Sequence, residues 1–180
     1  MRCVYVIGMP GVGKSTAVAT AMDLLGWQVT EERATPFAHT VYDSGAIQLG
    51  RNRAHFSGTD ALSMSVSPLA VEFMRTLPAP LVLGEGDRLG TAKFLLAVAV
   101  MPDVILEVVH LEAPPQVAWQ RASDRGSAQS WSWWRGRATK VRNLTHLLPC
   151  LTIDAARPPG AVAQDLAAVL AAPVGTVTPA

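Results

Sequence analysis

Cysteine is scarce in this sequence, which contains two cysteines among 180 residues. Cys3 and Cys150 lie in segments whose apolar character predicts buried strands, and no metal-type spacing joins them to the four histidines. A disulfide framework and a zinc site of the cysteine–histidine type are therefore not expected. We expect both cysteines to be reduced residues of the core.

Net charge and long apolar runs are also missing. The formal net charge is +1, which excludes a basic field over the whole protein, so any contact with nucleic acid must use a local patch. No apolar stretch reaches the roughly 18 residues of a membrane helix, and the apolar run before Gly8 is too short for the core of a signal peptide. The sequence thus predicts a cytoplasmic protein with no membrane partner.

Apolar residues, by contrast, make up 49% of the chain, which is enough for the core of one domain. Strands are predicted at residues 3–7, 27–30, 81–83, 104–109 and 151–153, and segments with helical spacing lie between them. This alternation predicts a single three-layer α/β domain over residues 1–172 with a five-stranded parallel sheet. Residues 31–59 show no clear period and should form substrate-facing loops, and residues 173–180 should form a flexible tail.

A glycine-rich pattern directly follows the first predicted strand and precedes a predicted helix. Residues 8–15 match G-x-x-x-x-G-K-[ST] at every fixed position, and a chance glycine-rich turn is the alternative. Glycines let backbone N–H groups wrap phosphates, Lys14 can reach the β- and γ-phosphates, and Ser15 can ligate magnesium. The sequence therefore predicts a P-loop NTPase fold that binds ATP with Mg²⁺. The loop residues expected to bind the nucleotide are Gly8, Met9, Pro10, Gly11, Val12, Gly13, Lys14, Ser15 and Thr16.

Acidic residues end the strand predicted at 81–83. A P-loop enzyme needs an acid beside its first strand to hold magnesium or the water around it, and Glu85 and Asp87 are the candidates, together with Ser15. The spacing does not distinguish between the two carboxylates. The alternative is a polar turn whose carboxylates are simply solvated.

Cationic residues gather at about 121–142, where they resemble a lid over the transferred phosphate. Arg121 and Arg125 are four residues apart and should share one helix face. We expect Arg121 to bind the nucleotide, and Arg125 and Arg135 to take part in catalysis. The alternative is a solvated basic face.

The chain from about residue 2 to residue 170 resembles the nucleoside and nucleotide kinase branch of the P-loop proteins. The resemblance rests on the N-terminal P-loop, the acid after the strand at 81–83, the strand and proline of residues 108–114, and the arginine-rich lid. It implies a five-stranded parallel sheet with the acceptor held opposite ATP.

Two stretches, residues 56–66 and 134–144, resemble segments of bacteriophage kinases that phosphorylate 5-hydroxymethyluracil within DNA. In such an enzyme the acceptor is the hydroxymethyl oxygen of the base, and an acidic residue must receive or orient its proton. This resemblance implies that Asp60 is the base, with Asp43 behind it. It also implies that the protein works in the host cytoplasm, if a phage encodes it.

Tryptophans and cations are interleaved in the lid, as expected for a protein that stacks on an exposed base and follows phosphates. Packing of the lid is the alternative role for the tryptophans. The residues expected to contact the DNA, beside Asp43, are Arg51, Arg53, Arg88, Trp131, Trp133, Arg137 and Lys140.

The sequence thus favours an ATP-dependent kinase that transfers the γ-phosphate to 5-hydroxymethyluracil in DNA. A nucleoside monophosphate kinase of the thymidylate type is the first alternative, because its acceptor phosphate would use the same arginines. A nucleotide-dependent binding or switch module is the second, although an arginine-rich lid suits transfer better than slow hydrolysis.

Overall fold

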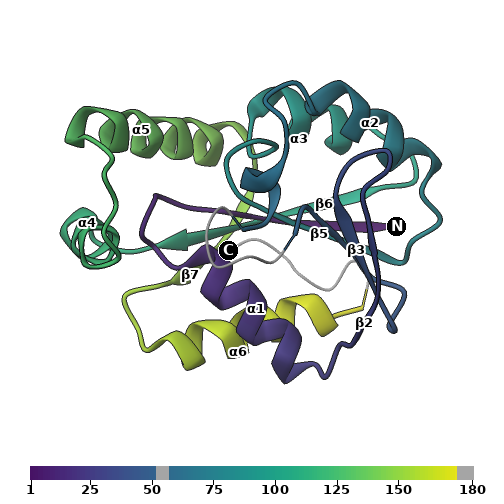
Figure 1. Cartoon of the computed structure of the whole chain (residues 1–180), viewed down its shortest axis with the longest axis horizontal. Coiled ribbons are helices and arrows are strands. Elements are labelled where there is room, and N and C mark those ends of the chain that lie inside the picture. The colour runs from purple at the N-terminus through teal and green to yellow at the C-terminus, as the bar shows by residue number, and fades with distance from the viewer. Residues whose placement is uncertain (52–56, 174–180) are drawn as a thin grey trace.

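A central sheet with helices on both faces forms the protein (Figure 1). The computed structural model describes residues 1–51 and 57–173. The predicted tail therefore lies outside the described residues, except for Pro173, and so does Arg53. Among the described helices, none combines the length and the apolar character needed to cross a bilayer.

Seven strands form the sheet in the order β2-β3-β4-β5-β1-β6-β7. Strands β4, β5, β1, β6 and β7 are parallel, whereas β2 and β3 extend the sheet in an antiparallel arrangement. The strands are β1 (Arg2–Ile7), β2 (Val29–Arg33), β3 (His39–Tyr42), β4 (Ile47–Leu49), β5 (Leu81–Glu85), β6 (Ile105–Glu112) and β7 (Cys150–Asp154).

The predicted three-layer α/β architecture is confirmed and its parallel part has five strands as predicted, but β2 and β3 make the whole sheet larger than the prediction. The segment expected to be loops, 31–59, contains β3 and β4, and β4 rather than residues 27–30 is the fifth parallel strand. Strand β2 pairs with β3 at the edge of the sheet, and all its residues are exposed. Periodicity did not reveal β4 because it has three residues, too few to establish a pattern.

Helices α1 and α6 cover one face of the sheet, and α2 and α3 cover the other (Figure 1). Alternation along β1 explains both contacts, because Cys3, Tyr5 and Ile7 join one core cluster and Val4 and Val6 join the other. Helices α4 and α5 lie beyond the carboxyl ends of β6 and β7, and the later part of α5 packs on the α2 and α3 side. The helices are α1 (Lys14–Leu24), α2 (Ser67–Thr76), α3 (Ala92–Ala99), α4 (Pro115–Asp124), α5 (Trp131–Leu147) and α6 (Pro159–Ala171).

Local signals set several helix starts. Proline occupies the first turn of α2, α4 and α6, where its missing N–H has no intrahelical partner to lose. The Thr91 hydroxyl caps α3 by accepting from the N–H of Phe94, and the Ser130 hydroxyl caps α5 by accepting from the N–H of Trp133. The Ser130 cap sets the start of α5 after the short connection that follows α4.

Both cysteines are free thiols, as predicted. Cys3 is fully buried, and burial raises the pKa of its thiol to about 12, so this side chain stays protonated and apolar. Cys150 lies partly buried at the start of β7. Neither cysteine lies at the carboxyl edge of the parallel strands, where β1 leads into the glycine-rich loop.

Arg2 fastens the last helix to the sheet. Its guanidinium pairs with Glu107 at 2.6 Å and donates to the carbonyls of Val169, Leu170 and Ala172 at the end of α6. Carbonyls in the last turn of a helix lack i+4 partners within it, so Arg2 stabilises the helix terminus as well as binding the carboxylate. The contact joins residues almost 170 positions apart in the chain.

Candidate active site

The glycine-rich loop connects β1 to α1 and has the predicted strand–loop–helix setting. Gly11 has φ +87°, and a Cβ on it would lie 2.0 Å from the carbonyl oxygen of Ala118 on α4. The loop therefore packs against α4 at a position where only glycine fits. Gly13 also has positive φ and directly precedes α1, whose first residue is Lys14. This arrangement directs the N-terminus of α1 toward the site, as phosphate binding requires.

The Lys14 ammonium group lies within the loop, where Nζ donates to the carbonyls of Gly8 at 2.9 Å and Met9 at 3.3 Å. Burial lowers the pKa of Lys14, and the nearby carboxylates of Glu85, Asp60 and Asp87 act in the opposite direction. The loop lysine and three of the predicted acidic residues therefore share one electrostatic environment.

Glu85 ends β5 beside the loop and is 2% exposed. Its Oε1 accepts a hydrogen bond from the Ser15 hydroxyl at 2.9 Å. Burial raises the pKa of Glu85 to about 7, opposed by the charge of Lys14 and by the Ser15 hydrogen bond. The structure thus brings together two of the three residues that the sequence assigned to magnesium, Ser15 and Glu85.

Among the residues that the structure describes, no group of three or more His, Cys, Asp or Glu side chains gathers as a metal site. Mg²⁺ in phosphoryl-transfer enzymes needs one or two protein oxygens, and substrate phosphates and waters complete its shell. Ser15 and Glu85 therefore fit Mg²⁺ that arrives with a nucleotide, and a site for tightly held Zn²⁺ would need more ligands.

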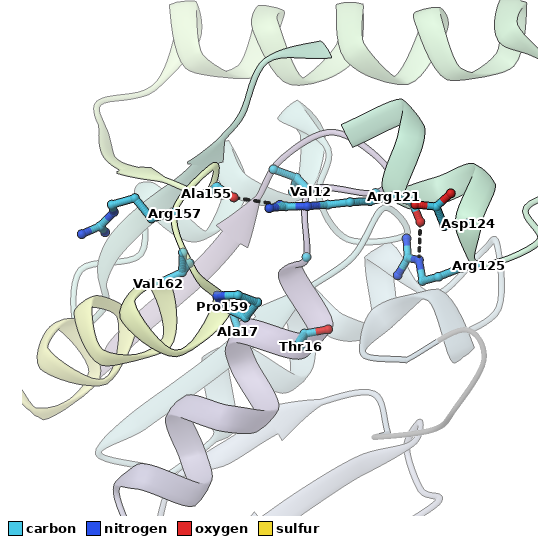
Figure 2. Close-up of a pocket in the computed structure, with 12 residues that line it drawn as sticks. Val12, Thr16, Ala17, Arg121, Asp124, Arg125, Ala155, Arg157, Pro159 and Val162 are labelled. Carbon is cyan, nitrogen blue, oxygen red and sulfur yellow. Dashed lines mark hydrogen bonds between the residues drawn. The ribbon is translucent and has the colours of Figure 1, made fainter. Parts of the chain in front are cut away.

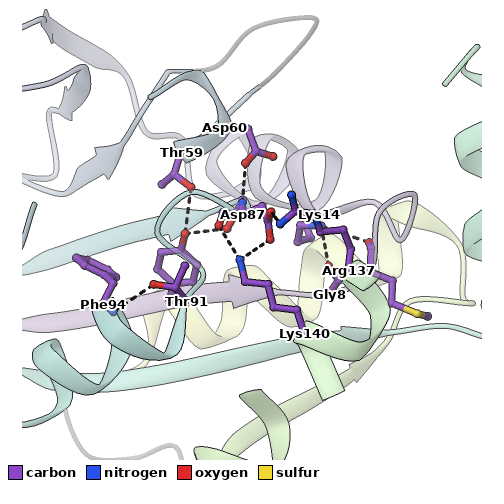
Figure 3. A network of polar contacts seen from close by, with 12 residues as sticks. Gly8, Lys14, Thr59, Asp60, Asp87, Thr91, Phe94, Arg137 and Lys140 are labelled. Carbon is purple, nitrogen blue, oxygen red and sulfur yellow. Dashed lines mark hydrogen bonds and ion pairs between the residues drawn. The ribbon is translucent and has the colours of Figure 1, made fainter. Parts of the chain in front are cut away.

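A short 3-10 turn, η1 (Thr59–Ala61), packs on the end of β5. A Cβ on Gly58 would lie 2.3 Å from Glu85 Oε1, and a Cβ on Gly86 would lie 2.9 Å from Thr59 Oγ1. These close approaches place Asp60 beside the strand end, where its Oδ1 accepts from the backbone N–H of Asp87 at 2.6 Å (Figure 3). No described residue bonds to Asp60 Oδ2.

Asp87 lies two residues after β5 and contacts α5. Its carboxylate forms ion pairs with Arg137 and with Lys140, the latter at 2.7 Å, and Lys140 Nζ also donates to the Asp87 carbonyl at 2.9 Å (Figure 3). Arg137 and Lys140, which the sequence assigned to DNA phosphates, are thus bound by a carboxylate of the protein itself. Asp87 itself bonds to these cations, whereas Glu85 is the carboxylate bonded to Ser15.

Tryptophans join α4, α5 and the P-loop. Trp131 stacks on Trp134 with centroids 5.0 Å apart, and both rings form T-shaped contacts with Trp119 of α4. Trp134 is 3% exposed and donates through Nε1 to the Pro10 carbonyl at 3.0 Å. Trp131 and Trp133 are 48% and 37% exposed, and Arg137 lies over the Trp133 ring at 5.1 Å. The packing role proposed for the lid tryptophans is therefore present, although Trp131 and Trp133 remain partly exposed.

A pocket of about 250 Å³ lies beside the start of α1 (Figure 2). Arg121 crosses it and donates to the Ala155 carbonyl at 2.8 Å, and Arg125 donates to the Arg121 carbonyl at 3.3 Å. The predicted nucleotide residue Arg121 and the predicted catalytic residue Arg125 thus lie at this pocket. It is lined by Gly11, Val12, Gly13, Thr16, Ala17, Arg121, Asp124, Arg125, Ala155, Arg157, Pro159 and Val162.

Two predicted site residues, Asp43 and Arg135, do not join the side chains gathered around the P-loop. Asp43 lies in the turn between β3 and β4, where its Oδ1 accepts from the backbone N–H of Gln28. Because β3 runs antiparallel to β4, this turn is at the opposite edge of the sheet from the P-loop, so Asp43 is not behind Asp60. Arg135 is exposed on α5, and none of the described side chains binds its guanidinium.

Two other arginines lie near the expected acceptor side. The Arg51 backbone bridges to Gly58, and its buried Nε has no hydrogen-bond partner among the described residues. The Nε of Arg88 donates to the Leu62 carbonyl at 3.3 Å, so this arginine supports the loop after η1.

Sequence reasoning missed several residues that build the site. The Tyr5 hydroxyl lies 3.1 Å from Thr59 Oγ1 and donates to the Gly86 carbonyl at 2.9 Å, which fixes η1 against β5. Arg157 was not singled out either, and Trp134 was considered only as one of the tryptophans that could stack on a base. The signal for Trp134 was its place in the tryptophan cluster, but no sequence pattern indicates the carbonyl that it meets.

Comparison with known structures supports the same fold. A deoxyadenosine kinase from M. mycoides with bound dATP is 13% identical, with TM-score 0.50, over 96% of this chain and 100% of that one. A gluconokinase from Sinorhizobium meliloti 1021 is 14% identical, with TM-score 0.53, over 94% and 93%. A sugar kinase from Janibacter sp. HTCC2649 is 17% identical, with TM-score 0.52, over 94% of each chain. At these identities the likeness shows the fold.

No curated protein matched the chain. A family model with the description P-loop Nucleotide Kinase3 matches residues 1–157, which include the P-loop, Glu85, Asp60 and both lid arginines of the pocket. The chain therefore belongs to this family of P-loop kinases.

Proposed function

We propose that this kinase uses ATP and Mg²⁺ to phosphorylate a hydroxyl group, and that the acceptor is the hydroxymethyl group of 5-hydroxymethyluracil in DNA. The observation that carries the hydroxyl acceptor is the position of Asp60. One of its carboxyl oxygens is fixed by the Asp87 N–H, and no described residue bonds to the other. An oriented carboxylate of this kind suits proton acceptance from an alcohol.

ATP would place its phosphates on the P-loop and its base in the pocket beside α1. Arg121 and Arg125 border that pocket, and the apolar side chains of Val12, Pro159 and Val162 offer contacts for a flat ring. Lys14 would move from the loop carbonyls to the β- and γ-phosphates, which are stronger acceptors. Bound Mg²⁺, held through Ser15 and Glu85, would neutralise charge on the phosphates.

The transfer forms one P–O bond, breaks another and moves one proton. The acceptor oxygen attacks the γ-phosphorus, the bond from that phosphorus to the β–γ bridging oxygen breaks, and ADP leaves with the electron pair. Asp60 accepts the hydroxyl proton as the new phosphate ester forms. Lys14 and the loop N–H groups stabilise charge on the phosphoryl oxygens, and Arg125 lies close enough to lower the pKa of Lys14 and so adds to the same positive field.

The DNA acceptor is supported by the exposed rings of Trp131 and Trp133 at the lid. An extrahelical base needs an aromatic partner, and Trp131 and Trp133 are the tryptophans of the lid that are partly exposed, at 48% and 37% of their residue surface. Arg137 and Lys140 add less to this proposal than the sequence suggested, because Asp87 already binds both.

A phosphate acceptor, as in a nucleoside monophosphate kinase, is the second candidate, and Arg51 favours it. This arginine lies just past the carboxyl end of β4, and no residue in the described part of the chain bonds to its buried Nε. An acceptor phosphate would supply one. The two candidates differ in the need for a base, because a phosphate oxygen has no proton to lose at neutral pH.

An acceptor panel tests the proposal. The protein is incubated with ATP labelled in its γ-phosphate and, separately, a 5-hydroxymethyluracil oligonucleotide, the thymine oligonucleotide, the free 5-hydroxymethyl mononucleotide and thymidylate. We expect label on the modified oligonucleotide alone. Preferred labelling of a mononucleotide would replace the DNA acceptor, and release of phosphate without any labelled acceptor would overturn transfer.

Asp60→Asn tests the role of the base separately. The amide keeps the oxygen that meets the Asp87 N–H but cannot accept the proton, so kcat should fall about a hundredfold or more with the KM for ATP little changed. Asp23→Asn, on the exposed surface of α1, is the matched control and should keep wild-type kcat. Near-normal kcat in the Asp60 variant would show that Asp60 is not the base.

A further inference from the structure

We propose that Asp87 is a positioning residue that ties the lid helix α5 to the acceptor-side turn η1. This inference rests on the proposed hydroxyl transfer, since it assigns Asp87 to the alignment of Asp60. The role differs from magnesium binding, for which Asp87 was a candidate by sequence.

The short segment at Asp87 contacts both α5 and η1. The backbone N–H of Asp87 donates to Asp60 Oδ1 on one side, and its carboxylate binds Arg137 and Lys140 on the other. Lys140 Nζ also reaches the Asp87 carbonyl, so the cation fixes the main chain as well as the side chain. Displacement of α5 would therefore move the peptide that orients Asp60 (Figure 3).

The turn η1 is held rigidly against the residues that follow β5. Gly86 meets Thr59 and Asp60 so closely that a Cβ on it would lie 2.9 Å from Thr59 Oγ1 and 3.1 Å from Asp60 Cγ. The Tyr5 hydroxyl bonds to both Thr59 and the Gly86 carbonyl. Because η1 is packed and bonded directly against residues 85–87, a displacement of Asp87 is transmitted to Asp60.

Helix α5 is also attached to the P-loop. Arg137 and Lys140 are three residues apart and thus share one face of α5. One turn earlier, Trp134 bonds to the Pro10 carbonyl of the P-loop. In addition to its apolar packing, helix α5 therefore has two polar attachments, one on the ATP side and one on the acceptor side. Asp87 provides the acceptor-side attachment.

The ion pairs are strong enough to hold the helix yet weak enough to release it. The side chains of Asp87, Arg137 and Lys140 are 31%, 32% and 25% exposed, so solvent screens them in part. Loss of both contacts should raise the open population of α5 about tenfold. A fully buried pair would resist opening far more.

A test uses hydrogen exchange, because it needs no acceptor. In the 180-residue chain, Asp87→Asn should increase amide exchange over residues 131–147 about tenfold. Lys140→Met should increase the exchange of the same amides somewhat less. The double variant should exchange no faster than Asp87→Asn, since both changes remove the same contact. Arg142→Met is the matched control, because this exposed arginine lies on the same helix and carries the same charge, and it should exchange like wild type.

The kinetic counterpart is a lower kcat for Asp87→Asn, by about tenfold, with the KM for ATP within about twofold. If no acceptor in the panel is labelled, the proposed function fails while the exchange result still decides the role of Asp87. Unchanged exchange of α5 in folded Asp87→Asn or Lys140→Met protein would overturn the proposal. A shifted magnesium requirement without faster exchange would overturn it too and return Asp87 to the metal.

Discussion

The buried carboxylate of Glu85 should make the stability of the metal-free protein fall as pH rises. Burial raises its pKa from 4.5 to about 7, so between these values the folded protein holds a proton that the unfolded chain releases. The contribution is fully present below pH 4.5 and is lost as pH passes about 7. The difference between the two pKa values corresponds to roughly 3 kcal/mol of unfolding free energy.

The variant that isolates this effect is Glu85→Gln, whose amide has the shape of the protonated acid and can still accept from the Ser15 hydroxyl. Urea unfolding without divalent metal, at pH 5 and pH 8, gives the free energies. Wild type should lose most of the roughly 3 kcal/mol between these pH values beyond whatever the variant loses.

Glu72→Gln is the matched control, because it removes an exposed carboxylate from α2 without touching the site. This control should retain the pH dependence of wild type. Identical pH dependence in wild type and Glu85→Gln would refute the reasoning, since it would mean that the Glu85 carboxyl is not held in the dry environment that the structure gives it.

Three further predictions test other parts of the structure. Lys14→Ala should lower kcat at least about a hundredfold while circular dichroism stays that of wild type, because the charge is lost without core volume. Gly11→Ala should weaken ATP binding, measured by calorimetry, and cost about 1 to 3 kcal/mol in urea unfolding, because the new methyl group meets the Ala118 carbonyl. Arg2→Met should cost about 3 to 5 kcal/mol by the same unfolding assay, because it leaves Glu107 buried without its partner; a cost below about 1 kcal/mol would mean that the pair is not needed.

The P-loop could be predicted from the sequence because its chemistry is local. Every fixed residue lies within eight positions, and the strand before it and the helix after it show their own periodicity. The pairing of Ser15 with the end of β5 could be anticipated in kind, since parallel strands bring their carboxyl ends to one edge. The choice of Glu85 over Asp87 needed the structure.

The lid contacts could not be predicted because their partners are far apart in the chain. Lys140 meets Asp87 across 53 residues, and Trp134 meets the Pro10 carbonyl across 124. A run of cations looks the same whether it faces solvent, phosphate or an internal carboxylate. Asp43 illustrates the opposite error, because its place at the far edge of the sheet follows from a hairpin between β3 and β4 that showed no clear period.

We propose that the chain moves the γ-phosphate of ATP to the hydroxymethyl group of a base in DNA. Mass spectrometry of a 5-hydroxymethyluracil oligonucleotide after incubation with protein, ATP and Mg²⁺ tests it most directly. We predict that the modified nucleoside gains one phosphate with wild type and none with Asp60→Asn or Lys14→Ala. An oligonucleotide that stays unmodified while a free mononucleotide gains a phosphate would contradict the claim.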